Sequence, residues 1–115
     1  MEWNILTETA QIEEIKANSF ESPQLIFKHS YRCGVSSMAL KQWERSVNQQ
    51  PLPAEQHIVD VVKDRMLSRD IAEVFRITHE SPQILLISNG KCIFNSSHED
   101  IDSSDIADLL LGSHA

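Results

Sequence analysis

Two cysteines are the residues best suited to chemistry in this 115-residue chain, and they stand in very different settings. Cys33 follows the apolar run 25–27 and stands where a helix is expected to begin. A helix N-terminus offers free backbone N–H groups and the positive end of the helix dipole, and both favour the nucleophilic thiolate. We therefore take Cys33 as the candidate catalytic nucleophile, with positive charge from His29 and Arg32 beside it. The alternative is a buried core thiol.

Ser36 stands three residues after Cys33, where a C-x-x-C enzyme keeps its second cysteine. Cys33 therefore cannot form a local disulfide, and a second thiol must come from elsewhere. Ser36 itself has two interpretations, which the sequence leaves open. It could donate a hydrogen bond to the Cys33 thiolate, or it could simply suit the first turn of a helix.

Cys92 is the other thiol, and it follows Asn89-Gly90, the strongest short signal for a β-hairpin. The hairpin turns the chain back beyond the strand 84–87, which places Cys92 far from Cys33. A disulfide requires Cα atoms within about 7 Å, so we predict no Cys33–Cys92 bridge. Cys92 is better explained as a structural thiol buried in a strand.

Composition narrows the functional classes. A net charge of −7 and a pI near 5.1 argue against nucleic-acid binding, and no apolar run is long enough to span a membrane. The start of the chain lacks the features of a signal peptide, so we expect a cytoplasmic protein with reduced cysteines and one domain over 1–115. We expect no metal site, because no ligand spacing links the five histidines. They are His29, His57, His79, His98 and His114.

The periodicity of apolar residues predicts nine elements. Strands are expected at 3–6, 25–27, 58–62, 84–87 and 91–95, and helices at 7–19, from Cys33 to about 48, from Ser68 to about 76, and from Asp102 to Gly112. The helix after Cys33 carries an apolar stripe for packing on a sheet. Its members are Val35, Ala39, Trp43 and Val47.

The order β-α-β-α-β-α-β-β-α, with a cysteine opening the second helix and Pro82 before the fourth strand, is that of the thioredoxin-like fold. This is an α/β fold whose central mixed sheet, here of four or five strands, has helices on both faces. The segments 33–36, 64–72, 79–83 and 96–101 further resemble the monothiol bacilliredoxins, also called the YtxJ-like family. The resemblance extends over nearly the whole chain.

The resemblance implies a thiol-disulfide oxidoreductase that removes bacillithiol from mixed disulfides on cytosolic proteins through Cys33. Bacillithiol would be a co-substrate, no tightly bound cofactor is expected, and the protein would be a monomer or a weak homodimer. The substrate-binding residues would be Arg32, Gly34, Ser81, a cis Pro82, Ser97 and His98. The hairpin independently predicts that Ser97 and His98 return toward Cys33. Lys28 and Arg32 are candidates for binding carboxylates of a small thiol.

Two positions depart from the family pattern, which commonly has proline where this chain has Gly34 and an aromatic residue where it has Glu99. Two other functions also remain open. The C-G-x-S segment resembles monothiol glutaredoxins, which suggests an iron-sulfur cluster held between two subunits by Cys33 and a small thiol. The chain could instead be a redox-inert interaction domain, in which Cys33 would titrate like an ordinary thiol.

Overall fold

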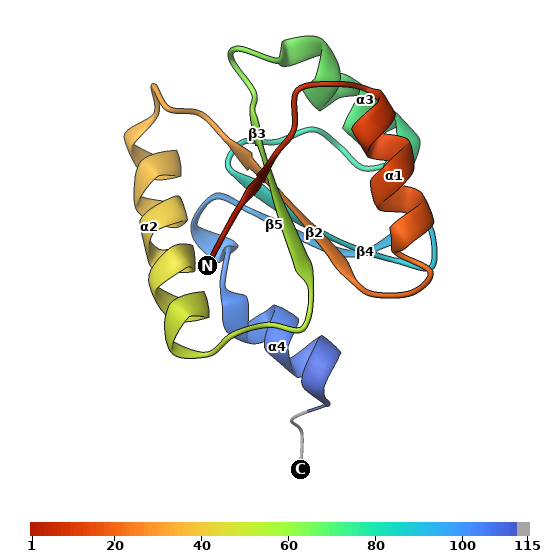
Figure 1. Ribbon diagram of the computed structural model, residues 1–115. Coiled ribbons are helices and arrows are strands. Elements are labelled where there is room, and N and C mark those ends of the chain that lie inside the picture. Colours follow the sequence, from red (N-terminus) through yellow and green to blue (C-terminus); the bar gives the residue numbers. More distant parts are fainter. Residues whose placement is uncertain (113–115) are drawn as a thin grey trace.

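The structure is a computed structural model in which residues 1–112 are described. It is built around a five-stranded sheet with the strand order β1-β3-β2-β4-β5 (Figure 1). Strands β1, β3 and β2 are parallel, β4 runs antiparallel to β2, and β5 runs antiparallel to β4. The strands are β1 (Asn4–Ile5), β2 (Gln24–His29), β3 (Glu55–Asp60), β4 (Gln83–Ser88) and β5 (Lys91–Ser97).

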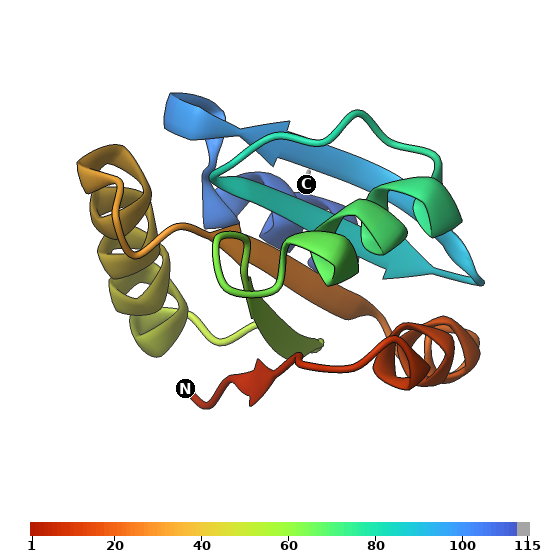
Figure 2. The same cartoon turned by 90° about the horizontal axis from the view of Figure 1, so that it is seen from above.

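Helices cover both faces of this sheet, as predicted. Helices α1 and α3 pack on one face, and α2 and α4 pack on the other (Figures 1 and 2). The helices are α1 (Ala10–Asn18), α2 (Gly34–Gln49), α3 (Arg65–Phe75) and α4 (Ser103–Leu111), with a short 3-10 helix, η1 (His98–Asp100), between β5 and α4. The predicted element order is confirmed.

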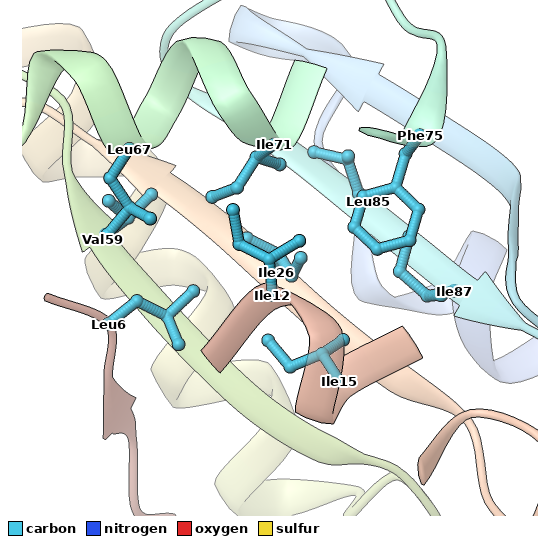
Figure 3. Packing of buried hydrophobic residues seen from close by; sticks show 10 residues of the cluster. All are labelled: Leu6, Ile12, Ile15, Ile26, Val59, Leu67, Ile71, Phe75, Leu85 and Ile87. Carbon is cyan, nitrogen blue, oxygen red and sulfur yellow. The ribbon is translucent and has the colours of Figure 1, made fainter. Parts of the chain in front are cut away.

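The core has two layers, separated by the sheet. Figure 3 shows the layer under α1 and α3, in which Ile26 of β2 meets Ile12 and Ile71 of the helices. The other layer joins Leu25 and Phe27 of β2 to residues of α2 and α4. Every residue of β2 is buried, because alternate side chains of a strand point to opposite faces and both faces are covered.

Several element boundaries differ from the sequence prediction. Helix α1 begins at Ala10 with Thr9 as its N-cap, later than the predicted helix 7–19. Strand β3 occupies Glu55–Asp60 instead of 58–62, because its polar residues have partners inside the molecule. The indole N–H of Trp43 donates to Gln56 Oε1 at 2.8 Å, and His57 Nε2 lies 2.8 Å from Gln24 Oε1. Helix α3 begins at Arg65, so the prediction that Ser68 caps it is wrong.

The last helix begins where the sequence predicts. The side chain of Asp102, the N-cap of α4, accepts a hydrogen bond from the Ser104 N–H at 2.9 Å. Ile106 of its buried face is fully covered, and Gly112 ends the helix with a positive φ of 60°. The short α4 therefore carries its own start and stop signals.

The Asn89-Gly90 turn joins β4 and β5, and the predicted hairpin is confirmed. Both turn residues have positive φ, 52° and 78°, as a tight two-residue hairpin turn requires. Ser19, at the end of α1, holds the turn: its carbonyl accepts from the Asn89 N–H at 3.0 Å and its Oγ accepts from the Gly90 N–H at 2.8 Å. The turn is therefore attached to α1 as well as to its own strands.

Gly90→Ala is expected to destabilise the protein by about 1–2 kcal/mol, since a Cβ is unfavourable at a φ of 78°. The new methyl group would also lie 2.8 Å from the Phe20 ring, which would have to move. Urea unfolding measures the change. Gly34→Ala is the matched control, because no atom lies within 4 Å of a Cβ there and φ is not positive. Equal stability changes for the two variants would contradict this explanation.

Candidate functional site

Cys33 is the N-cap residue of α2, in the loop that follows the central strand β2. Its thiol is free and partly exposed, so a substrate can reach it. The carbonyl of Cys33 accepts the Ser37 N–H at 3.0 Å, which ties the residue into the first helical turn. The neighbours Arg32 and Gly34 are both exposed. The structure thus has a reachable thiol at a helix N-terminus.

Ser36 belongs to this first turn of α2 and is fully buried. Its Oγ accepts a hydrogen bond from the Ser30 N–H at 3.0 Å and lies 2.6 Å from Nδ1 of His29. Both contacts are to the end of β2 and neither is to Cys33. A hydrogen bond from Ser36 to the thiolate therefore stays a prediction, because it depends on which of the two groups, His29 or Ser36, supplies the proton between them.

His29 does not have the role that the sequence suggested. It is buried at the end of β2, and burial lowers the pKa of its imidazole, while Asp60 and Glu44 act in the opposite direction. The imidazole is therefore neutral near neutral pH, and the prediction that it supplies positive charge beside Cys33 is wrong. Its importance to the site is its hydrogen bond to Ser36, which sequence spacing alone did not indicate.

The strands β4 and β5 bring a second set of predicted residues to the same edge of the sheet. Lys28 of β2 is opposite Gln83, and Gln83 is opposite Ser97, so Pro82 and Ser97 lie near the end of β2. The Ser81–Pro82 peptide bond is cis, the geometry that the family resemblance implies. The Pro82 carbonyl accepts the His98 N–H at 2.9 Å. These contacts bring the Pro82 loop and the start of η1 together.

Ser81 and His98, on either side of the contact between the Pro82 loop and η1, are two further polar residues at this edge of the sheet. The Oγ of Ser81, directly before the cis proline, is buried and has no partner among residues 1–112. Nδ1 of His98 lies 3.4 Å from the Glu80 carboxylate, and both side chains are substantially exposed. His98 also has a positive φ of 54°, which is uncommon for a residue other than glycine and is concentrated at functional sites.

An open groove of about 390 Å³ runs between α2 and η1, beside the start of α2. The two helices lie at the same end of the sheet (Figure 2). Val35 is on the rim of this groove with 47% of its surface exposed, so the prediction that it belongs to the core stripe is wrong, whereas Trp43 and Val47 are buried as predicted. The groove is lined by Val35, Met38, Ala39, Gln42, His98, Glu99 and Ile101.

Comparison with known families settles the resemblance. A family described as monothiol bacilliredoxin BrxC matches residues 4–106, which is most of the chain. The chain belongs to the monothiol bacilliredoxin family. The matched region contains Cys33 and Ser36, the Pro82 loop and Ser97-His98. The family that the sequence motifs suggested is therefore confirmed.

Solved structures with similar folds support the thioredoxin-like fold. A candidate oxidoreductase with a thioredoxin fold is 30% identical, with a TM-score of 0.76 over 90% of this chain and 88% of that chain. A mutant thioredoxin from Halobacterium salinarum is 16% identical, with a TM-score of 0.71 over 99% and 92% of the two chains. Fasciola hepatica thioredoxin is also 16% identical, with a TM-score of 0.69 over 95% and 97%. The thioredoxin-like fold is thus confirmed, and this bacilliredoxin is a thiol oxidoreductase by family.

Cys92 lies at the other end of the bacilliredoxin hairpin from Ser97, as predicted. It is opposite Ile87, close to the Asn89-Gly90 turn, and it packs against the core layer under α1 and α3. Its Sγ donates to the Phe94 carbonyl at 3.3 Å, and burial raises the pKa of its thiol. Cys92 is therefore a weak nucleophile in a structural position, and like Cys33 it forms no disulfide.

Residues 1–112 contain no candidate for a metal site or a membrane-spanning helix. No three His, Cys, Asp or Glu side chains in this part of the chain are grouped closely enough to hold a metal ion. No helix in the same range is long and apolar enough to cross a membrane. His114, one of the five histidines considered above, lies outside the described residues.

Lys28 is a residue that sequence reasoning assigned to the wrong environment. The sequence predicts that it contacts substrate carboxylates, but its side chain is fully buried on the α1 and α3 side of β2. Its Nζ lies 3.0 Å from Nδ1 of His79, and Ser68 Oγ also approaches this nitrogen at 3.3 Å. Burial lowers the pKa of Lys28 to about 8, while Cys92 acts weakly in the opposite direction.

Lys28→Met is expected to stabilise the protein by about 1–2 kcal/mol at neutral pH, because it removes a buried cation. This gain in stability is smaller than the full shift in the pKa of Lys28 implies. His79, which the Lys28 ammonium group contacts, is exposed, and water around it screens the charge. Between pH 8 and 10.5, Lys28 is protonated in the unfolded chain but has lost its proton in the folded chain. The stability of the wild type therefore rises with pH over this range, and the stability advantage of Lys28→Met becomes smaller.

Urea unfolding of both proteins at about pH 7 and about pH 10 measures this difference. Lys41→Met, which removes an exposed lysine from α2, is the control and is expected to show no such pH dependence. A loss of stability at neutral pH, or the same gain at both pH values, would show that burial of the charge is not the cause.

Proposed function

We propose that this protein removes bacillithiol from mixed disulfides on protein cysteines, with Cys33 as the attacking thiol. The observation that supports this most directly is the position of Cys33: an accessible free thiol at the N-terminus of α2 in a monothiol bacilliredoxin chain. Ser36 occupies the place of a local resolving thiol, and Cys92 lies at the turn end of the β4–β5 hairpin. Chemistry at Cys33 must therefore use a thiol from another molecule.

The reaction is an exchange of sulfur partners without net oxidation. The Cys33 thiolate attacks the bacillithiol sulfur of the mixed disulfide, and a new S–S bond forms as the old one breaks. The repaired protein cysteine leaves as a thiolate and takes up a proton from water. Cys33 then carries bacillithiol until a second thiol attacks this new disulfide and restores the Cys33 thiolate.

The residues around Cys33 have separate roles in this proposal. The partnerless Ser81 hydroxyl and the backbone beside Pro82 would bind the disulfide-bearing segment, while Ser97 and His98 would contact the small thiol at the start of η1. Arg32 is exposed beside Cys33 and could pair with a carboxylate of bacillithiol. No tightly bound cofactor is required. We also propose a cytoplasmic location, where small thiols keep cysteines such as Cys33 and Cys92 reduced.

Cys33→Ser is expected to abolish release of bacillithiol from a bacillithiolated protein, since a serine hydroxyl cannot replace the thiolate in the exchange. Cys92→Ser is the matched control and should react within about twofold of wild type, because Cys92 is far from the site and has a raised pKa. Mass spectrometry follows loss of bacillithiol from the substrate and its appearance on Cys33. Release by Cys33→Ser at the wild-type rate would refute the proposal.

A further inference from the structure

The hydrogen bonds of Ser36 leave its single proton to serve only one partner. A serine oxygen has one proton to donate and two lone pairs to accept hydrogen bonds. The Ser30 N–H occupies one lone pair at 3.0 Å. The remaining lone pair and the proton are left for Nδ1 of His29, 2.6 Å away, and for one further partner of the hydroxyl. The protonation of His29 therefore decides what Ser36 can offer to Cys33.

The length of the His29–Ser36 contact indicates which atom holds the proton. A distance of 2.6 Å is shorter than the 2.7–3.2 Å that is usual for an N–H donor, and it fits an O–H donor better. We therefore assign Ser36 as the donor to Nδ1, with the imidazole proton on Nε2. In this arrangement Ser36 turns only a lone pair toward Cys33, which suits a thiol but not a thiolate.

The helix start brings Ser36 within reach of Cys33. Cys33 is the N-cap and Ser36 is the third helical residue of α2. In C-x-x-C enzymes the side chains at these two positions form a disulfide, so the side chains of Cys33 and Ser36 are close enough to meet. If the imidazole proton is on Nδ1 instead, His29 donates to Ser36, and the hydroxyl proton becomes free to point at the Cys33 sulfur.

We propose that His29 is a positioning residue whose tautomer, acting through Ser36, decides whether the Cys33 thiolate receives a hydrogen bond. When Cys33 ionises, the imidazole proton moves from Nε2 to Nδ1 by way of water, and His29 is uncharged before and after. The exchange stabilises the thiolate once it has formed and withholds the donor from the thiol. The inference rests on the proposed role of Cys33 as the reacting thiol.

The surroundings of His29 are consistent with a switch of tautomer and not of charge. His29 is opposite Asp60 of β3, and Glu44 of α2 also acts on it, but burial dominates and keeps the ring neutral. The Tyr31 ring packs edge-on against the imidazole with centroids 4.1 Å apart, and Phe27 lies edge-on at 6.3 Å. These rings hold the imidazole plane while leaving its protonation free to change.

A double-mutant cycle on thiolate formation tests the proposal. The proteins are His29→Phe, Ser36→Ala and the combination, all in a Cys92→Ser background so that one thiol titrates. Thiolate absorbance and iodoacetamide alkylation against pH give the ionisation midpoint of Cys33. Ser36→Ala should raise the midpoint by about one pH unit, because a hydrogen bond to the thiolate is lost. His29→Phe should lower it by about half a unit, because Ser36 no longer needs His29 to release its proton.

The coupling between the two substitutions tests the proposal directly. When Ser36 is replaced by alanine, His29→Phe should have no effect on the ionisation midpoint of Cys33. An equal effect in both backgrounds, or no effect of His29→Phe with Ser36 intact, would overturn the proposal. Ser68→Ala is the control, since this buried serine contacts His79 on the other face of the sheet and should not move the midpoint. Bacillithiol is not used in these measurements, so their failure is distinguishable from failure of the proposed function.

Nuclear magnetic resonance of the His29 ring keeps the proposal testable if His29→Phe does not fold. The ¹⁵N shifts should show the proton on Nε2 below the Cys33 midpoint and on Nδ1 above it. In Ser36→Ala this change should disappear. A tautomer that stays the same through the titration of Cys33 would overturn the inference.

Discussion

The structure depends on the complete burial of its central strand. β2 is covered by helices on both faces and by strands on both edges, so none of its six side chains reaches solvent. Three of these side chains are polar, and a buried polar group is costly unless it is hydrogen-bonded. Each one has a partner: Gln24 with His57, Lys28 with His79, and His29 with Ser36. The demand for internal partners thus links the strand to the elements around it.

The site is a consequence of where this strand ends. In a sheet of this topology the carboxyl ends of β2 and β3 and the start of β4 meet at one edge, and the loop after β2 delivers Cys33 to the N-terminus of α2. The hairpin returns Ser97 and His98 to the same edge and leaves Cys92 at the other. One thiol is therefore available for chemistry, and the other is half-buried against the core.

Much of this arrangement could be predicted from the sequence. Strand and helix periods, the Asn89-Gly90 turn and the Asp102 cap are local signals, and the structure confirms the element order, the turn and the cap that they predict. The main errors are the starts of α1 and α3, the boundaries of β3, and the environments of Val35, His29 and Lys28. Local propensity treated Gln56 and His57 as loop residues, because it cannot register that Trp43 and Gln24 satisfy them across the core. Val35 has helical spacing, but the face it occupies borders a groove.

The sequence by itself determined the fold, the family and the monothiol character of the protein, since these follow from periodicity, motif spacing and the presence of serine at position 36. Only the tertiary structure decided how the residues around Cys33 are charged and paired. His29 and Lys28 are adjacent in a strand and point to opposite faces, so their environments depend on α2 and on His79, which are distant in sequence. Burial and long-range hydrogen bonds set their protonation, and neither is encoded in a local pattern.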